Sequence, residues 1–227
     1  MRYIHKTSTV SLLFLFLLIT QGTKAQSNLP YADDRNIHFG FSLGLNFMDF
    51  GVIPLDPEND VSVSSLSPGF SVGAISDLRL SRYFNLRFTP TLNLGQRTLH
   101  YADSSKVDVL SVPLYLPLYL KYSSERKGNY RPYIIAGGGL WWDWGRNKEK
   151  PILLKTFDTM LEIGVGCDLY FSFFKLSPEL KFSLGMNDML IPLSQRDAGM
   201  ISGEDRKYTE SLSKLTTKMI TLSFNFE

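Results

Sequence analysis

Apolar and polar residues alternate through most of the chain after residue 36. In residues 37–47, the odd positions from Ile37 to Phe47 are all apolar, whereas the even positions hold His, Gly, Ser, Gly and Asn. Successive side chains of a β-strand point to opposite faces, so this period of two predicts a strand with one apolar face. The same alternation recurs at residues 70–79, 84–94, 112–121, 133–143, 161–169, 176–184 and 220–226. The pattern predicts an all-β protein of eight strands with no helix of consequence.

The chemistry of the two strand faces indicates which one meets water. A soluble barrel with an apolar lumen, of the lipocalin type, would show the same alternation. Here, however, the polar positions hold many small residues instead of the Lys and Glu of a solvated surface. Small side chains suit the crowded interior of an eight-stranded barrel, and the Leu, Phe, Ile and Val of the other face would form a very large apolar patch in water. We therefore favour an eight-stranded antiparallel transmembrane β-barrel (OmpA/OmpX-like) over the soluble barrel.

The connections between the predicted strands alternate in length. Short turns are predicted near residues 81–83, 123–130 and 172–175, and longer polar stretches near residues 48–67, 96–108, 145–155 and 188–213. Bacterial outer-membrane barrels have short periplasmic turns and longer external loops. Since the predicted strand number is even, both termini of the barrel are expected on the periplasmic side.

Aromatic residues gather near the ends of the predicted strands. We interpret them as membrane girdles, in which the Trp cluster around Asp143 anchors the interface in preference to stacking on a sugar. The girdle residues are Phe47, Tyr83, Phe84, Tyr122, Trp142, Trp144, Phe171 and Phe174, and the Trp cluster also includes Trp141. The last strand ends with Phe224 and Phe226, and this aromatic ending resembles the signal that the barrel-assembly machinery reads during insertion. That machinery and outer-membrane lipid are therefore expected partners.

The N-terminus has the pattern of a secretory signal peptide. Arg2 and Lys6 precede an apolar run at residues 10–19, and residues 23–25 (Thr-Lys-Ala) offer a small-residue cleavage site. The run is too short for a membrane-spanning helix, which needs about 20 apolar residues. We expect a signal peptide at residues 1–25, a short periplasmic segment at residues 26–35 and the barrel at residues 36–227. The predicted location is the bacterial outer membrane.

Composition and charge exclude several other classes of protein. The 227 residues are 44% hydrophobic and 20% charged, which argues against long disorder, collagen and coiled coil. Removal of the first 25 residues takes three of the 24 basic residues and leaves 21 basic against 22 acidic residues. Such a nearly neutral chain gives no electrostatic reason to expect nucleic acid as a partner. The single cysteine, Cys167, excludes an intramolecular disulfide.

Charged residues also occur on the predicted inner face of several strands. Because a desolvated charge without a partner costs several kcal/mol, we interpret them as a structural salt-bridge network that fills the lumen; the alternative is a proton or ion pathway. A solute channel is not expected, since eight strands leave little open bore. The predicted network comprises Asp77, Arg79, Arg87, Glu162, Asp168, Glu179 and Lys181.

The sequence predicts no catalytic, cofactor or metal site. The histidines beyond the signal peptide are His38 and His100, and only His100 has Ser and Asp neighbours, at positions 103–105. Such neighbours are common in polar loops, so we do not expect an enzyme. The acidic pairs at residues 33–34 and 204–205 lack the ligand spacing of a specific Ca²⁺ site.

Four segments resemble the PorT family of small outer-membrane barrels. They are residues 112–122 (VPLYLPLYLKY), 131–139 (RPYIIAGGG), 162–168 (EIGVGCD) and 174–183 (FKLSPELKFS). The resemblance covers the chain beyond the signal peptide, and it implies an outer-membrane barrel associated with the type IX (Por) secretion system, which exports proteins that bear a C-terminal sorting domain.

Two functional hypotheses follow from these observations. The first is an accessory outer-membrane component of type IX secretion, which acts through contacts with other secretion components instead of as an open pore. The second is a general small barrel that serves envelope integrity or adhesion through its external loops, without transport.

Overall fold

The structure is a computed structural model, and it describes residues 28–54, 62–63, 67–100, 106–144, 154–191 and 212–227. The predicted signal peptide at residues 1–25 lies outside this part of the chain. One short 3₁₀ helix, η1 (Ala32–Asp34), precedes the strands. The strands are β1 (Ile37–Pro54), β2 (Ser62–Val63), β3 (Ser67–Arg79), β4 (Phe84–Phe88), β5 (Thr91–His100), β6 (Lys106–Ser111), β7 (Pro113–Ser123), β8 (Tyr130–Asp143), β9 (Phe157–Tyr170), β10 (Lys175–Gly185) and β11 (Leu212–Phe226). No helix in the described ranges is long and apolar enough to cross a membrane.

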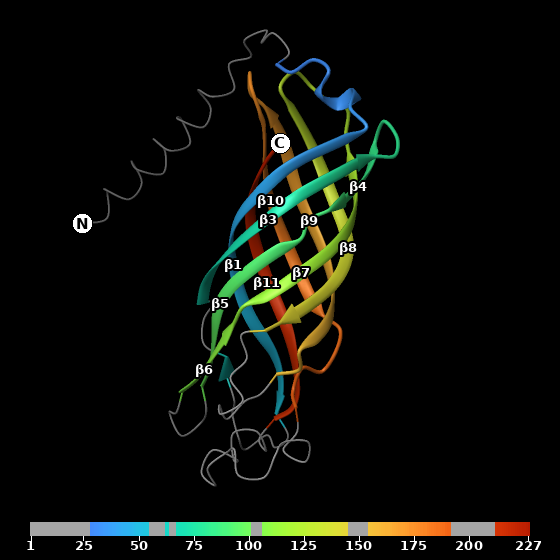
Figure 1. Cartoon of the computed structure of the whole chain (residues 1–227). Coiled ribbons are helices and arrows are strands. Elements are labelled where there is room, and N and C mark those ends of the chain that lie inside the picture. The colour runs from blue at the N-terminus through green and yellow to red at the C-terminus, as the bar shows by residue number, and fades with distance from the viewer. Residues whose placement is uncertain (1–27, 55–61, 64–66, 101–105, 145–153, 192–211) are drawn as a thin grey trace, which may run out of the picture.

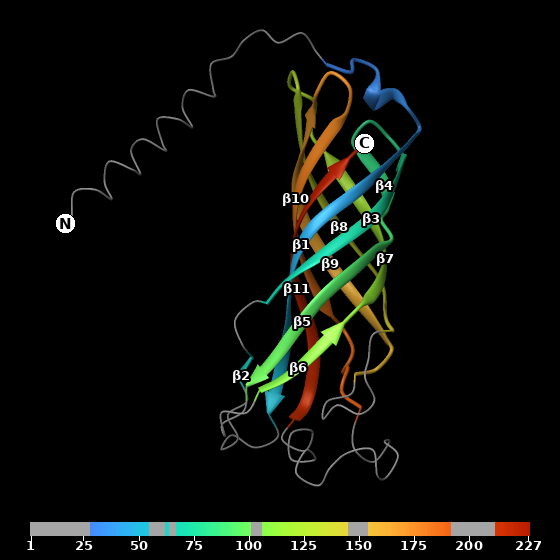
Figure 2. The ribbon, with the colours of Figure 1, turned by 60° about the vertical axis from the view of Figure 1, so that its left-hand side comes forward.

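The strands close into a barrel in which every pairing is antiparallel (Figure 1). β4 and β5 together form one strand of the wall, interrupted at Pro90, because β3 and β7 each pair with both of them. β6 continues into β7, and β1 pairs with both β3 and β11, which closes the ring. The wall therefore has the eight strands that the alternation predicts. β2, the outer part of β5 and β6 extend beyond the wall (Figure 2).

The apolar face of the strands points outward. In β9, for example, Leu161, Ile163 and Val165 are each more than half exposed, whereas the intervening Glu162 is buried in the lumen. The same alternation of exposed apolar and buried positions holds in β7, β8 and β10, where the buried positions include Pro, Tyr, Ile and Trp as well as charged residues. The prediction of an outward apolar face is thus confirmed, and a barrel with an apolar lumen and a solvated outer wall is excluded.

Small residues make room for the large side chains of the lumen. A Cβ atom added at Gly166 would collide with the phenol ring of Tyr133, and one added at Gly137 would collide with the Leu118 carbonyl oxygen on the neighbouring strand. Since Tyr133 is itself buried, Gly166 makes room for its ring inside the narrow barrel, whereas Gly137 lets the backbone of β7 approach closely.

The two ends of the barrel differ. Three short turns, at residues 80–83, 124–129 and 171–174, lie at the end that also holds residues 28–36 and Glu227; we call this the turn end (Figure 1). The opposite end carries the connections from β1 to β3, β5 to β6, β8 to β9 and β10 to β11, and we call it the loop end. The prediction that the turn end is periplasmic remains a prediction.

Several strands are longer at the loop end than the sequence predicts. β1 continues to Pro54, β11 begins at Leu212 instead of residue 220, and much of the predicted loop at residues 96–108 forms the β5–β6 hairpin. In the first half of β11 the pattern is inverted, because Lys218 is exposed while Leu215 and Met219 are buried. A search for apolar outward positions misses such a segment, whose outer face is suited to water.

Candidate functional site: a lumen filled at both ends

Arg87 is the centre of the ionic cluster in the lumen. Its side chain is 1% exposed and forms ion pairs with Asp77 at 2.8 Å, Glu227 at 3.0 Å and Glu179 at 3.3 Å. These four residues come from β4, β3, β10 and the residue after β11, so the contacts cross the barrel. Three carboxylates around one guanidinium compensate the cost of burying that charge.

A second cation shares one of these carboxylates. Lys181 contacts Glu162 at 3.3 Å and Glu179 at 3.6 Å. Two phenols complete the cluster: Tyr133 donates a hydrogen bond to Glu179 at 2.7 Å, and Tyr119 donates one to Glu162. These contacts tie four neighbouring strands, β7 to β10, together inside the barrel.

The pair between Lys121 and Asp168 is more isolated. Both side chains are 2% exposed, and the ammonium lies 2.8 Å from the nearer carboxylate oxygen. Asp168 also accepts a hydrogen bond from the Ser177 hydroxyl at 2.6 Å. The Lys121 ammonium lies 4.0 Å from the centre of the Tyr133 ring. Among the described residues, Asp168 is the one acid that forms an ion pair with Lys121.

Six of the seven charges predicted for the lumen lie there, and Arg79 does not. Arg79 is the last residue of β3, its side chain is 29% exposed, and it pairs with Asp34 at the turn end. Its place at the strand terminus lets it reach beyond the barrel. The sequence reasoning also missed buried members of the network, namely Tyr119, Lys121, Tyr133, Lys175 and Glu227. Strand alternation places Lys121 on the inner face and could have identified it. Glu227 comes after the last residue of β11, so the strand pattern does not assign it to a face.

The loop end is filled by apolar side chains. Met48, Tyr115, Trp141, Met160 and Met219 form a buried cluster inside the barrel. Trp141 is fully buried in the lumen, so its predicted role as an interface anchor is wrong. Its neighbours Trp142 and Trp144 do point outward.

A segment that follows β10 adds further buried apolar side chains. Met189 and Leu190 are buried, and Leu190 forms a β-bridge with Leu154. One carboxylate oxygen of Asp188 accepts hydrogen bonds from the backbone N–H groups of Leu190 at 3.1 Å and Leu215 at 3.0 Å. Buried apolar side chains therefore occupy much of the described part of the loop end.

At the turn end, residues 28–36 fold across the barrel mouth; we call this segment the N-terminal cap. Its Asp33 carboxylate contacts Arg131 at 3.2 Å and Arg126 at 3.5 Å, and accepts a hydrogen bond from the Tyr170 hydroxyl at 2.5 Å. The Arg126 guanidinium also lies 3.6 Å from the centre of the Tyr170 ring and donates to the Leu29 carbonyl at 3.0 Å. The cap is thus fastened to the wall on the side of the β7–β8 turn.

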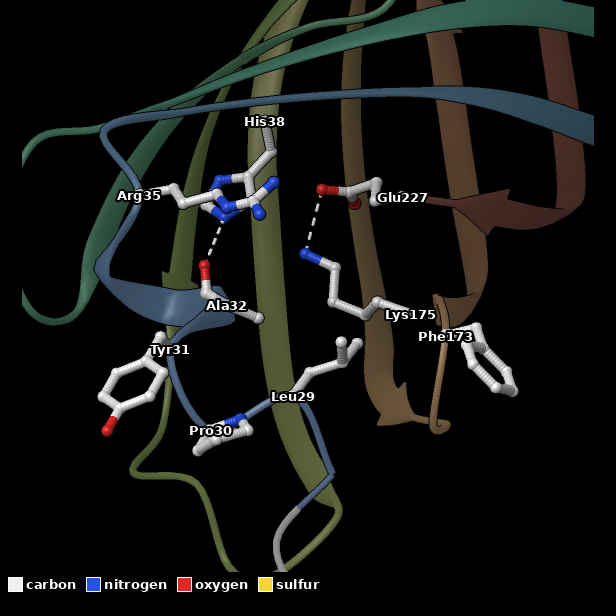
Figure 3. Close-up of a pocket in the computed structure, with 9 residues that line it drawn as sticks. All are labelled: Leu29, Pro30, Tyr31, Ala32, Arg35, His38, Phe173, Lys175 and Glu227. Atoms are coloured by element: carbon white, nitrogen blue, oxygen red, sulfur yellow. Dashed lines mark hydrogen bonds and ion pairs between the residues drawn. The ribbon is translucent and has the colours of Figure 1, made fainter.

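A cavity of about 350 Å³ lies between the N-terminal cap and the barrel mouth (Figure 3). Leu29, Pro30 and Ala32 line it from the cap, where the Ala32 carbonyl lies 2.6 Å from Nε2 of His38. On the other side, Lys175 and Glu227 form an ion pair at 2.9 Å. Charged and apolar groups therefore share this cavity, which also contacts Tyr31, Arg35 and Phe173.

The described residues contain no group of three or more His, Cys, Asp or Glu side chains placed to hold a metal ion. His38 contacts a backbone carbonyl, and no hydroxyl nucleophile is recorded as its partner within the described ranges. His100 ends β5, and its neighbours at residues 103–105 lie outside the described residues, as does the acidic pair at residues 204–205. The expectation that the protein is not an enzyme stays a prediction.

Aromatic side chains form an outward group at each end of the barrel. At the loop end, Trp142 lies 5.0 Å from Trp144 and 5.7 Å from Phe157 between ring centres. At the turn end, Phe84 lies 5.1 Å from Tyr122, and Phe171 lies 5.0 Å from Phe174. This arrangement fits the two aromatic girdles of a membrane barrel.

The aromatic residues at the end of β11 take part in the turn-end group. Phe226 stacks on Phe41 with ring centres 4.8 Å apart, and Phe224 points outward. At the same end, the hydrogen bond from Tyr83 to Glu125, 3.0 Å long, raises the pKa of that phenol above its ordinary value.

Comparisons with known proteins agree with this architecture. The model of the family described as "Outer membrane protein beta-barrel domain" matches residues 24–190. Solved structures to which the chain is similar include OprG from Pseudomonas aeruginosa, with 10% identity, a TM-score of 0.49 and coverage of 90% of this chain and 96% of OprG. Neisserial surface protein A gives 10% identity, a TM-score of 0.44 and coverage of 84% and 98%. The outer-membrane enzyme PagL gives 9% identity, a TM-score of 0.39 and coverage of 81% and 97%.

No curated protein sequence matches the chain. The closed eight-stranded wall, the outward apolar face and the aromatic girdles define an integral β-barrel of the bacterial outer membrane. The chain belongs to the outer membrane protein beta-barrel domain family, whose model matches most of its length.

Proposed function

We propose that this barrel is an accessory component of type IX protein secretion, which acts through protein contacts instead of as an open pore. The observation that carries the proposal is the filled lumen. Buried ion pairs around Arg87 occupy its interior, and the apolar cluster around Trp141 packs its loop end. An eight-stranded barrel filled with side chains offers no path for a polypeptide, so a partner must form the conduit.

The link to type IX secretion rests on the resemblance of the chain to the PorT family. The resembling segments at residues 112–122, 131–139, 162–168 and 174–183 coincide with parts of β7 to β10. They contribute Lys121, Asp168 and Glu179 to the lumen network and Tyr133 beside them. The resemblance therefore includes residues that fill the lumen as well as residues that face lipid.

Depletion of the protein tests this proposal. In an organism with a type IX system, depletion should strand cargo with the sorting domain in the periplasm while the abundance of unrelated outer-membrane barrels stays normal. Fractionation followed by immunoblotting of one cargo protein measures the result, and expression of the intact chain should restore export. Cargo export at the wild-type rate would refute the type IX role. Detergent sensitivity or lost adhesion with normal export would then favour a general envelope barrel.

We also propose two steps in the biogenesis of the protein. Residues 1–25 act as a cleaved signal peptide, which leaves residues 26–35 as the periplasmic segment that includes most of the N-terminal cap. The aromatic end of β11, with Phe224 and Phe226, is recognised by the barrel-assembly machinery. The outward position of Phe224 and the stacking of Phe226 on Phe41 support the second step, because both rings lie on the surface of the wall.

A further inference from the structure

The turn end carries an excess of positive charge. We define the turn-end surface as residues 28–36, 79–83, 123–131 and 171–175 together with Glu227. It contains seven cationic side chains, Arg35, Arg79, Arg82, Arg126, Lys127, Arg131 and Lys175, against the four acids Asp33, Asp34, Glu125 and Glu227. Because the chain beyond residue 25 is nearly neutral, this surface is electrostatically distinct from the rest of the protein.

Internal ion pairs leave part of this charge uncompensated. Asp34, Glu125 and Asp33 neutralise one or two arginines each, and Glu227 pairs with Lys175. Within the described ranges, neither Arg35 nor Lys127 forms an ion pair. Both residues are exposed. The turn-end surface can therefore attract acidic groups without first breaking an ion pair of its own.

The cavity beside Arg35 gives this surface a shape as well as a charge. Its volume of about 350 Å³ is bounded by the apolar side chains Leu29 and Pro30. Two aromatic residues at its edge are unusually exposed, Tyr31 at 78% and Phe173 at 94%, and both rings point away from the cavity (Figure 3). Hot spots of protein interfaces are enriched in Tyr and Arg and lie at pockets, and this site has both features.

The site is held in place before any partner arrives. Asp33 joins the N-terminal cap to Arg126, Arg131 and Tyr170, while the Ala32 carbonyl contacts His38 of β1. A rigid cap loses little conformational freedom on binding, which favours affinity.

We infer that the turn-end surface is a docking site for an acidic segment of a partner protein, which places an apolar side chain in the cavity and a carboxylate against Arg35, while Lys127 adds to the positive charge of the surface. This inference deepens the proposed function and rests on it, since it names the surface through which contacts are made. A protein is favoured over a lipid surface because the cavity and Tyr31 belong to the cap that crosses the barrel mouth, away from the lipid-facing wall.

Peptide binding tests the docking site directly. The intact protein in nanodiscs of zwitterionic lipid would be titrated into a fluorescein-labelled hexapeptide of Asp, Glu, Leu and Phe, and fluorescence anisotropy would be recorded at low salt and at roughly 0.5 M salt. Saturable binding that weakens with salt is expected. Arg35→Glu should weaken it by at least about fivefold, the equivalent of one lost charge contact. Ala32→Phe should also weaken it by filling the cavity.

Lys218→Glu is the matched control, because Lys218 is exposed on β11, well away from the turn end. It should bind the peptide like the unaltered protein, and the gel mobility of unboiled samples shows that each variant is folded. A hexapeptide with Lys in place of the acids should not bind. Equal binding by the Arg35 and Lys218 variants overturns the inference, as does binding of anionic phosphatidylglycerol vesicles without binding of the acidic peptide.

Export assays separate the failure of this inference from the failure of the proposed function. Arg35→Glu should strand sorting-domain cargo, whereas Lys218→Glu should not. If deletion of the protein blocks export but the Arg35 variant exports normally and the peptide does not bind, only the docking site is refuted. If deletion itself leaves export unchanged, the type IX role is refuted whatever the peptide does.

Discussion

Removal of the Asp168 carboxylate should destabilise the barrel more than removal of any better-shared acid in the lumen. Asp168→Asn keeps the shape of the side chain but leaves the Lys121 ammonium, 2% exposed, without an ion-pair partner among the described residues. Breaking a buried pair in this way costs about 3–5 kcal/mol. The nearby Tyr133 ring, 4.0 Å away, can return part of that cost through a cation–π contact worth about 1–2 kcal/mol. We expect a net loss of about 1–4 kcal/mol.

Glu179→Gln is the matched comparison. Arg87 would keep Asp77 at 2.8 Å and Glu227 at 3.0 Å, and Lys181 would keep Glu162 at 3.3 Å. Every cation near the substituted residue therefore retains a carboxylate. The substitution converts charge-assisted hydrogen bonds into neutral ones, so we expect the free energy of unfolding to fall by about 1–2 kcal/mol.

Equilibrium unfolding in detergent micelles measures both losses, with the tryptophan fluorescence and the gel mobility of unboiled samples as two readouts. The double variant Asp168→Asn with Lys121→Met should recover most of the lost stability, because it removes the unpaired charge together with its former partner. An Asp168 variant as stable as the Glu179 variant would show that Lys121 is hydrated or compensated elsewhere. Absence of recovery in the double variant would refute the reasoning from isolated charge.

Two further substitutions test the face of the strands and the fastening of the cap. Leu116→Arg places a charge on the lipid-facing wall and should lower the free energy of unfolding by about 2–4 kcal/mol near the bilayer midplane. Ser183→Thr changes a buried lumen position but keeps the hydroxyl, so it should cost much less. Similar losses for the two variants in the unfolding assay would contradict the face assignment. Asp33→Asn should loosen the N-terminal cap and speed amide hydrogen exchange of residues 28–36, since Asp33 has two arginines and a tyrosine as partners. Asp34→Asn, which removes one exposed pair, should change exchange little, and equal exchange in both variants would show that Asp33 does not hold the cap.

The sequence predicts the barrel well because a membrane imposes a strict pattern on its wall. In β7 and β9 each outward position must be apolar, so the period of two is visible without any alignment. The polar face also identifies Arg87, Glu179 and Asp168 as lumen residues, because a charge in a strand with one lipid-facing side can only point inward. Their pairing is set by strand register and barrel closure, which bring Glu227 next to Arg87 although 140 positions separate them in the chain.

The sequence is less informative where the wall leaves the membrane. In the first half of β11, exposed Lys218 and buried Leu215 reverse the membrane pattern, so the search for outward apolar residues ends too early. The N-terminal cap is missed for a different reason. Residues 28–36 have no periodicity, and their position depends on single contacts such as Asp33 with Arg131, which no local pattern predicts.

The barrel combines two kinds of interior, one polar and one apolar. Within the membrane the wall is apolar outside, so the lumen can be polar, and buried ion pairs such as Lys121–Asp168 tie its strands together. Toward the loop end the interior becomes apolar, as in the cluster of Trp141, Met160 and Met219. Neither interior leaves a path for a polypeptide, and the lipid-facing wall offers few polar groups for recognition. Specific recognition of a partner must therefore fall to the two ends, and of these the turn end presents a preformed cavity beside uncompensated positive charge. A partner that docks there would meet the residues that also close the lumen, Lys175 and Glu227, so docking and lumen closure would be physically connected at this end of the barrel.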